Sequence, residues 1–231
     1  SEMCIRDRVI GARWVDTNKG DTQAPEIRSR LVAQEVKRAG TVEQYFAATP
    51  PLSSLKLLLS IAVTAVLPRR EKIYAKKGAW IVQFLDVKKA HFWAKALREL
   101  YVELPEEYRR RHNITGDFVG KLLRSMYGMR DAASLWERLV AEKMKSLGFG
   151  QGKSSPCIFF HPLRDMRTTL HGDNFVSLCS RIDADWFYEE LSKDCQVKVE
   201  GVFGPPGEPD TVQTIRIFFR HRRHKTDCTR T

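Results

Sequence analysis

The sequence has few cysteines and lacks a long apolar run. Its 231 residues include five cysteines, none in a CxxC pair, at Cys4, Cys157, Cys179, Cys195 and Cys228. An odd and widely spaced set excludes a disulfide scaffold and is typical of reduced thiols in an intracellular protein. The longest apolar run, residues 57–67, is interrupted by Ser60 and Thr64. Because a membrane span needs ~20 apolar residues, we expect no membrane partner.

Repeats and low-complexity tracts are also absent. No collagen, coiled-coil or solenoid period is visible. Hydrophobic residues make up 42% of the chain and charged residues 29%, which is ordinary for a globular protein. The composition excludes a chain that is disordered throughout, and the length suits one large domain or two small ones.

Positive charge, in contrast, is in excess. The chain has 39 Lys and Arg against 28 Asp and Glu, a formal net charge of +11, and its pI is near 9.6. This balance favours a polyanionic partner, nucleic acid first. The alternative is a set of solvated lysine faces, which are common on globular proteins.

The first eight residues stand apart. Residues 1–8, SEMCIRDR, back-translate to the end of a transposase-based sequencing adapter. We interpret them as an assembly scar without structural meaning, at the front of a truncated conceptual translation. Their charges cancel, so the net charge of the chain does not depend on them.

Hydrophobic patterning predicts mixed elements in the first half of the chain. The apolar residues at helical spacing between 52 and 67 are Leu55, Leu58, Leu59, Ala62 and Val66. Ser53 or Ser54 is a suitable N-cap for this helix, and Pro68 is a stop. The other segments expected are extended pieces at 13–17 and 30–34, a buried strand at 80–87, helical residues to about Arg98, and strands at 100–104 and 118–123.

The second half has clearer turn signals. Asp131 is a suitable N-cap and Gly148 a suitable C′ residue for an amphipathic helix at 131–147. Gly172-Asp173-Asn174 favours a hairpin between two strands. The remaining elements expected are strands at 156–161, 166–171, 175–179, 196–202 and 212–219 and a helix at 183–193. The mixture predicts an α+β fold.

Two acids occupy positions suited to chemistry. Asp86 ends a buried apolar strand, and Asp173 lies at the tip of the expected hairpin. Carboxylates that a sheet brings together are how phosphoryl-transfer sites collect Mg²⁺. Taken alone, each acid is equally typical of a cap or turn residue.

Five blocks, in order over about residues 14–201, resemble copia-type LTR retrotransposon reverse transcriptases. LDVKKAHF at 85–92 resembles the family's first catalytic motif, Leu-Asp-Val-Lys-Thr-Ala-Phe-Leu. The other blocks are RLVAQ at 30–34, YFAATPPLSSLKLLL at 45–59, KLLRSMYGMRDAASLW at 121–136 and LGFGQGKSSPCIF at 147–159. The resemblance implies a right-hand polymerase with fingers and a palm, whose mostly antiparallel sheet has helices packed on one face.

The resemblance also implies an activity and its partners. The family extends a primer with deoxynucleoside triphosphates on an RNA or DNA template, using two Mg²⁺ ions, with Mn²⁺ as a possible substitute. Its location would be intracellular, in a cytoplasmic retrotransposon particle. The expected division is a scar at 1–8, a fingers-like part at 9–79, a palm at 80–203 and a truncated segment toward the thumb at 204–231. RNase H, integrase and most of a thumb are expected to be missing.

Residue roles carry over by position in these blocks. Asp86 matches the first metal-binding aspartate, and Val87 would offer its backbone carbonyl to metal. The residues expected at the substrate are Arg28, Arg30, Lys89, Ala90, His91, Tyr127 and Gly128. Arginines suit a triphosphate because a guanidinium donates two parallel hydrogen bonds. His91 stands where the family has the Phe that blocks a ribose 2′-hydroxyl, so sugar discrimination by this chain is an open question.

The fourth catalytic block departs from the family pattern. The family has Tyr-x-Asp-Asp at the hairpin tip, and this chain has His171-Gly172-Asp173-Asn174. Asp173 is retained as a metal ligand, while Asn174 supplies a neutral oxygen in place of the second catalytic carboxylate. We expect weaker metal binding and a slower reaction, because charge stabilisation dominates such sites. Two hypotheses stay open: a working reverse transcriptase, and a catalytically decayed remnant that binds nucleic acid.

Lys198 is the last catalytic candidate. It lies in CQVKVEG, where the family has Phe-x-x-Lys-Asp-Leu-Gly. In that position a lysine can protonate the departing pyrophosphate. A solvated strand lysine is the alternative.

Overall fold

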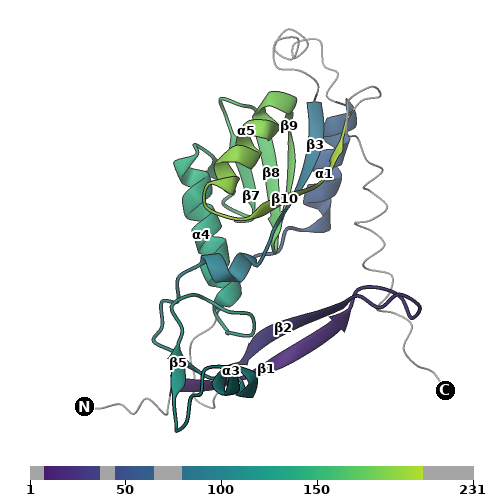
Figure 1. The fold of residues 1–231 in the computed structure, drawn as a ribbon. Helices are drawn as coiled ribbons and strands as arrows, with labels where there is room; N and C mark the ends of the chain where they lie inside the picture. The colour runs from purple at the N-terminus through teal and green to yellow at the C-terminus, as the bar shows by residue number, and fades with distance from the viewer. Residues whose placement is uncertain (1–7, 37–44, 65–79, 205–231) are drawn as a thin grey trace, which may run out of the picture. The chain divides into compact units, whose positions relative to one another are not determined.

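A computed structural model describes residues 8–36, 45–64 and 80–204 of the chain (Figure 1). The chain divides into two compact units, each made of two separate stretches of sequence. Unit 1 combines residues 1–47 with 89–140, and unit 2 combines 48–88 with 141–231. Both units contain helices together with largely antiparallel sheets, so the α+β class is confirmed. The assignment of fingers and palm boundaries stays a prediction.

Unit 1 contains a four-stranded sheet with the order β2-β1-β4-β5. β1 (Val9–Asn18) and β2 (Ile27–Gln34) form a long antiparallel ribbon, with a register that runs from Gly11↔Gln34 to Asn18↔Ile27. β4 (Tyr101–Glu103) is parallel to β1 and antiparallel to β5 (Val119–Lys121). The extended pieces expected near residues 13 and 30 are therefore confirmed as parts of longer strands.

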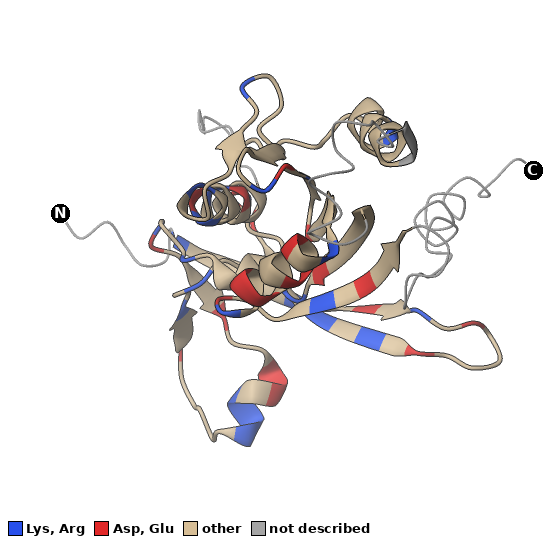
Figure 2. Ribbon diagram, turned by 90° about the horizontal axis from the view of Figure 1, so that it is seen from above, with Lys and Arg blue, Asp and Glu red and all other residues tan. Residues whose placement is uncertain are grey.

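Three helical segments complete unit 1. η2 (Ala90–Trp93) is a single 3₁₀ turn, and α4 (Ala132–Ser146) begins here and continues into unit 2. α3 (Glu106–Arg111) has acidic residues in its first turn and arginines in its last, visible as red and blue bands (Figure 2). This order stabilises a short helix because it complements the helix dipole. The sequence pattern did not predict α3, since six residues are too few to show a helical period.

The core of unit 1 is small and contains a buried ionic triad. Its apolar members are Ala33, Leu100, Met126, Met129 and Ala132. Beside them, the Arg98 guanidinium donates to Glu35 at 2.7 and 3.0 Å and to Asp131 at 2.7 and 2.8 Å. Burial acts to raise the pKa of Glu35, but hydrogen bonds from Arg98 and from the Arg130 backbone hold that pKa below its usual value. One arginine thus joins the end of β2, the segment before β4 and the start of α4.

Unit 2 is built on a six-stranded sheet with the order β10-β3-β9-β8-β7-β6, in which every pair is antiparallel. The strands are β3 (Trp80–Val87), β6 (Gly150–Gln151), β7 (Ile158–His161), β8 (Met166–His171), β9 (Asn174–Ser180) and β10 (Val197–Phe203). β3 and β9 are buried along almost their whole length. Such strands are apolar on both faces because both faces are covered.

Helices cover opposite faces of this sheet. α1 (Leu52–Thr64) packs Leu58 against Val82, Phe84, Val176 and Leu178. α5 (Arg181–Ser192) lies on the other face, where Phe187 meets Phe175 with ring centroids 5.8 Å apart (Figure 1). The expectation of helices on one face only is therefore wrong. The reason is that β9 has apolar side chains on both faces: Val176 and Leu178 on one face and Phe175 on the other. Each face is buried by a helix.

Several predicted element ends are corrected. α1 begins at Leu52, and the Ser54 backbone N–H donates to the Pro51 carbonyl at 2.9 Å, so Pro51, not a serine, precedes the helix. The helical stretch expected to reach Arg98 ends at Trp93, because Ala94 is extended and its carbonyl accepts the Ser125 backbone N–H.

Some other predicted features are confirmed, and some lie outside the described residues. Asp131 precedes α4 as expected, but its carboxylate pairs with Arg98. Gly148 ends the helix with a φ of 92°, as a C′ glycine does. The part of the first predicted helix beyond residue 64 and the strand predicted at 212–219 lie outside the described residues.

The ionic triad predicts a large and local stability effect. Arg98→Met should lower the free energy of unfolding by about 2–3 kcal/mol, because it leaves the buried Asp131 and the half-buried Glu35 without their shared cation. Arg110→Met is the matched control, since its ion pair with Glu106 is on the surface and should leave stability unchanged. Urea denaturation measures both. Equal effects of the two substitutions would contradict a stabilising role for the triad.

Candidate active site

The two candidate aspartates meet at one end of the unit 2 sheet. Asp86 on β3 is the register partner of Asn174 on β9, and Asp173 directly precedes Asn174. The β8–β9 hairpin turns through Gly172 and Asp173, with His171 paired to Asn174. The Val87 backbone N–H donates to the Asp173 carbonyl at 2.9 Å. Strand pairing therefore brings together residues that are 87 positions apart in sequence (173 − 86).

Burial and neighbouring negative charges both act on the Asp86 carboxyl. Burial raises the pKa of the Asp86 carboxyl, and the negative charges of Asp173 and Glu200 raise it further. Lys198 and Lys88 act in the opposite direction on the same pKa. A cation near Asp86 would relieve this repulsion, because its charge is opposite to that of the carboxylates.

Asn174 forms a direct bond with its neighbour. Its Nδ2 donates to Asp173 Oδ1 at 3.0 Å. An aspartate at this position could not donate that bond, since an ionised carboxylate only accepts. Asn174 thus removes one negative charge from the site and also occupies an oxygen of the remaining carboxylate. The motif alone reveals the missing charge, but only the geometry shows the second effect.

Lys198 faces the same end from β10. It is the register partner of Asp86, and its Nζ lies 2.8 Å from Glu200 Oε1. The register shifts between Val199 and Gly201, which makes Glu200 the extra residue of a β-bulge. Sequence reasoning missed Glu200. The available signal for Glu200 was a glutamate in a strand that otherwise favours β-branched residues. Bulges of this kind commonly change the direction of side chains next to active sites.

The donor set suits a divalent cation. Asp86 and Asp173 carry hard oxygen ligands of the kind that Mg²⁺ and Mn²⁺ prefer. Within residues 8–36, 45–64 and 80–204, no three Asp, Glu, His or Cys side chains gather closely enough to form a metal-binding group. Asp86 and Asp173 are therefore the two carboxylates at this end of the sheet that could serve as cation ligands.

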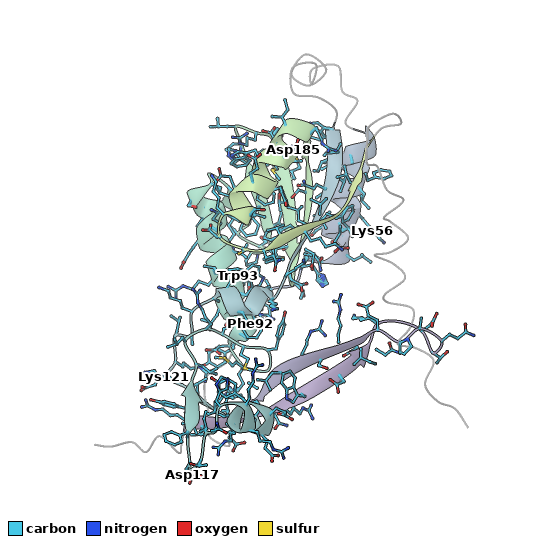
Figure 3. All side chains as sticks on the ribbon, in the orientation of Figure 1. Lys56, Phe92, Trp93, Asp117, Lys121 and Asp185 are labelled. Carbon is cyan, nitrogen blue, oxygen red and sulfur yellow. The ribbon has the colours of Figure 1, made fainter. Side chains whose placement is uncertain are left out.

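The seven residues predicted to contact substrate all lie in unit 1. Lys89 has a φ of 55°, a left-handed conformation that turns the chain out of β3 and into η2. The His91 ring packs edge-on against Tyr127 at 4.8 Å, and Phe92, which with Trp93 projects from η2, packs against the same ring at 5.6 Å (Figure 3). Ser125 Oγ donates to the His91 carbonyl at 2.7 Å. The predicted positions around His91 and Tyr127 are therefore one packed group.

Residue 128 has to be a glycine because its backbone lies very close to β2. The Ala33 backbone N–H donates to the Tyr127 carbonyl at 2.7 Å, which brings the next residue against the strand. A Cβ at Gly128 would lie 1.9 Å from the Ala33 carbonyl oxygen and 2.7 Å from Val32 Cγ1, and the φ of Gly128 is 89°. Glycine satisfies both constraints because it has no Cβ.

The two predicted triphosphate contacts lie on the ribbon of unit 1. Arg28 and Arg30 are exposed on β2, and Arg28 Nε is 3.6 Å from Glu26 Oε1. Their exposure leaves both guanidiniums accessible to an anion.

The apolar character of the helices bears on the expectation that the chain has no membrane partner. The helices concerned are those of residues 8–36, 45–64 and 80–204. There, no helix combines the length and apolar character that crossing a membrane requires.

Three cysteines lie in the described residues. Cys157 and Cys179 are buried and Cys195 is half-buried, all three as free thiols. Burial raises the pKa of the Cys179 and Cys195 thiols, that of Cys195 to about 11. Cys157 and Cys179 are small residues of the core.

Comparison with known proteins decides the family. A family model described as "Reverse transcriptase (RNA-dependent DNA polymerase)" matches residues 3–173. The chain belongs to this family. The matched range includes Asp86 and ends at Asp173, so it does not reach Asn174 or Lys198.

The curated relatives are retrotransposon polyproteins. The chain is similar to the "Retrovirus-related Pol polyprotein from transposon TNT 1-94" of Nicotiana tabacum, with 26% identity over 183 residues, 76% of this chain and 12% of that protein. The corresponding polyproteins from transposons RE2 and RE1 of Arabidopsis thaliana are 22% and 21% identical over 155 residues, 65% of this chain and 10% of each relative. No solved structure matches. The copia-type resemblance is confirmed, and the chain spans 12% or less of these relatives' length.

The packing of Gly128 predicts a large destabilisation when a methyl group is added. Gly128→Ala should destabilise unit 1 by at least about 3 kcal/mol, since the Cβ overlaps a backbone oxygen at an unfavourable φ. Gly172→Ala is the control, because Gly172 has a φ of 63° but no atom within 4 Å of an added Cβ. It should cost only about 1 kcal/mol. Similar decreases of stability in urea denaturation would show that the approach to β2 is not the cause.

The raised pKa of Asp86 predicts that replacing this residue increases thermal stability, and that the increase depends on pH. An acid whose pKa is raised by folding stabilises the fold below its unfolded pKa, and this contribution disappears as the pH rises through the folded pKa. Asp86→Asn should therefore raise the Tm near pH 7 in EDTA, and the gain should disappear toward the ordinary Asp pKa of about 3.9. Exposed Asp117→Asn serves as the control without a gain (Figure 3). A gain for Asp86→Asn that is independent of pH would exclude charge repulsion as its cause.

Proposed function

We propose that this domain is an RNA-directed DNA polymerase that joins a deoxynucleotide to a primer 3′-hydroxyl. The observation that carries the proposal is the pairing of β3 with the β8–β9 hairpin, which places Asp86 beside Asp173 in a chain of the reverse transcriptase family. The partners would be an RNA or DNA template, a primer and deoxynucleoside triphosphates. The location would be a cytoplasmic retrotransposon particle.

Asp86, Asp173 and the Val87 carbonyl are the proposed cation ligands. A bound Mg²⁺ or Mn²⁺ would supply Lewis acidity and neutralise phosphate charge. In the fold, Asp86 is presented by a strand whose other residues are mostly buried, and the backbone of Asp173 is tied to Val87. The carboxylates therefore hold their positions without a ligand, which is the preorganisation that charge-stabilising catalysis requires.

The other predicted residues receive roles in the same reaction. We assign the Lys89 and Ala90 backbone amides to the triphosphate, with Arg28 and Arg30 as polyanion contacts. The His91 ring, held edge-on by Tyr127, would bound the sugar, and its ring nitrogens can hydrogen-bond where a Phe cannot. Tyr127 and Gly128 would adjoin the template.

Lys198 would act as the general acid that protonates pyrophosphate. Its register position opposite Asp86 supports this role. Its Nζ lies 2.8 Å from Glu200 Oε1, and an ammonium is the form of lysine that can give a proton.

A second candidate is a nucleic-acid-binding remnant without catalysis. The bond from Asn174 to Asp173 favours it, because the amide satisfies a carboxylate oxygen that a cation would use. The two candidates differ in one measurable property, primer extension, and agree in binding nucleic acid.

Primer extension on an RNA template, with Mg²⁺ and separately with Mn²⁺, tests the proposal. Asn174→Asp should raise the rate by at least about tenfold, since it restores a charge and frees Asp173. Asn174→Ala separates these two effects, because it frees Asp173 without adding charge. Asp86→Ala is the negative control and should abolish extension.

The outcomes separate the candidates. Extension by the unaltered chain that Asp86→Ala removes supports the polymerase. Extension only after Asn174→Asp indicates an intact fold with an inactivated site. If no variant extends the primer while all of them bind it, the remnant is favoured.

A further inference from the structure

His161 is a buried titratable side chain that the proposed reaction does not use. It is the last residue of β7, and only 6% of its surface is exposed. It pairs with Met166 at the start of β8, whereas His171 at the other end of β8 pairs with Asn174 of the candidate active site. The titration of His161, which histidine undergoes near physiological pH, is therefore separate from that of the proposed cation ligands.

The ring of His161 contacts three elements, which can be followed in Figure 1. Its Nδ1 accepts the backbone N–H of Arg164, in the turn between β7 and β8, at 3.3 Å. The ring is also hydrogen-bonded to the backbone of Leu147, which directly follows α4. It packs edge-on against Phe149, with centroids 5.0 Å apart, and against Trp186 of α5 at 5.8 Å. One side chain thus joins the end of α4, the turn and α5.

These contacts require one neutral form of the imidazole. A ring nitrogen that accepts a hydrogen bond carries no proton, so the proton of the neutral ring is on Nε2. Nε2 lies toward the end of α4, since a Cβ added to Gly148 would be 3.1 Å from it. Carbonyl groups at a helix end lack partners within the helix, and the Nε2–H is placed to donate to Leu147.

The surroundings of the ring oppose its protonation. Burial lowers the pKa of His161 below its usual value, and the positive charge of Arg164 lowers it further. The bonds to backbone carbonyls and the negative charge of Asp183 act in the opposite direction. The Asp183 carboxylate is already engaged, since Arg164 Nη1 donates to its Oδ1 and Ser180 Oγ to its Oδ2, both at 2.7 Å.

Other charged side chains in the last turn of α4, in the β7–β8 turn, on β8 and on α5 have partners of their own or are exposed. The pairs are Lys143–Asp194, Asp165–Arg167, Arg181–Asp185 and Glu190–Lys193, and the exposed residues include Lys145 and Glu189. Arg164 and Asp183 are therefore the charged groups that act on His161.

Protonation of His161 changes its contact with the turn from attraction to repulsion. A proton on Nδ1 replaces the acceptor with a donor, which then faces the Arg164 N–H. It also adds a positive charge near the Arg164 guanidinium, which stacks on the Trp186 ring at 3.7 Å. The turn has little apolar packing of its own, since Leu163 is 87% exposed, and Asp165 has an unfavourable φ of 51°.

We propose that His161 is a pH-sensitive latch: the neutral ring holds the turn of residues 162–165 against the end of α4 and against α5, and protonation releases that turn. Release would uncover one face of Trp186, because the Arg164 guanidinium leaves this ring. All parts of the latch belong to unit 2, and its action does not depend on the proposed polymerase activity.

The direction of the pH dependence follows from the lowered pKa. A base whose pKa is lowered in the closed state stabilises that state above its ordinary pKa, which is about 6.5 for histidine. This contribution is lost as the pH falls from there through the pKa of the closed state, because the open state binds the proton more tightly. Over this range the equilibrium constant for opening should increase by up to about tenfold per pH unit.

Hydrogen exchange of the Arg164 amide measures the opening. NMR of the full chain in EDTA gives its protection factor, the exchange rate of an unstructured amide divided by the observed rate. This factor should be constant above about pH 7.5 and should fall by up to about tenfold per unit below about pH 6.5. It should be at least about tenfold smaller than that of Leu178 in β9, because the turn opens without unfolding the sheet.

Two variants and one spectroscopic measurement isolate the role of His161. In His161→Asn the amide oxygen takes the place of Nδ1 as acceptor but does not titrate, so the protection of Arg164 should become independent of pH. His112→Asn is the matched control, since His112 is exposed at the end of α3, and it should retain the pH dependence. Ring ¹⁵N shifts of His161 in the unaltered chain should show a neutral ring protonated on Nε2, whether or not the variant folds.

Four results would overturn the proposal. They are an Arg164 protection factor that does not change between about pH 7.5 and 5.5, a pH dependence that survives in His161→Asn, a neutral ring protonated on Nδ1, and equal protection of Arg164 and Leu178. The last would show that the whole sheet unfolds. Because the assay contains neither a divalent cation nor nucleic acid, a failed polymerase does not affect its outcome.

Discussion

The antiparallel pairing of β3 with β9 is the constraint on which the rest of unit 2 depends. Both strands are buried along almost their whole length, from Trp80↔Ser180 to Asp86↔Asn174. Because side chains alternate between faces, a slip of one residue would exchange the side chains that pack on α1 with those that pack on α5. The apolar core thereby sets the register, and the register sets which polar residues meet where the strands end.

The end of the same sheet shows how stability and chemistry oppose each other. Asp86 and Asp173 are close enough to raise the Asp86 pKa, so their proximity costs folding free energy whenever no cation is present. Asn174 reduces this cost in two ways, because it removes a charge and donates a hydrogen bond to Asp173. In the proposed cation site, the same residue would weaken cation binding.

Unit 1 is stabilised by different means. Its apolar core is small, and Arg98 joins three segments through Glu35 and Asp131. Tyr127 and Gly128 add a backbone contact to β2 that tolerates no side chain at residue 128. On the ribbon, Arg13, Arg28 and Arg30 share one face and are exposed, while Val32 of the same face lies against Gly128.

The sequence alone determined the elements with strong periodic or turn signals. The strand at Trp80–Val87 and the hairpin at Gly172–Asp173 were predicted correctly, because an apolar run and a tight turn are local properties. Motif order identified the family, and with it Asp86, Asp173 and the departure at Asn174. Tertiary structure decided what depends on partners far away in sequence. The bond from Asn174 to Asp173, the bulge at Glu200, the pairing of Asp131 with Arg98 and the shared face of Arg13, Arg28 and Arg30 all arise from strand register or long-range packing, which no local pattern contains.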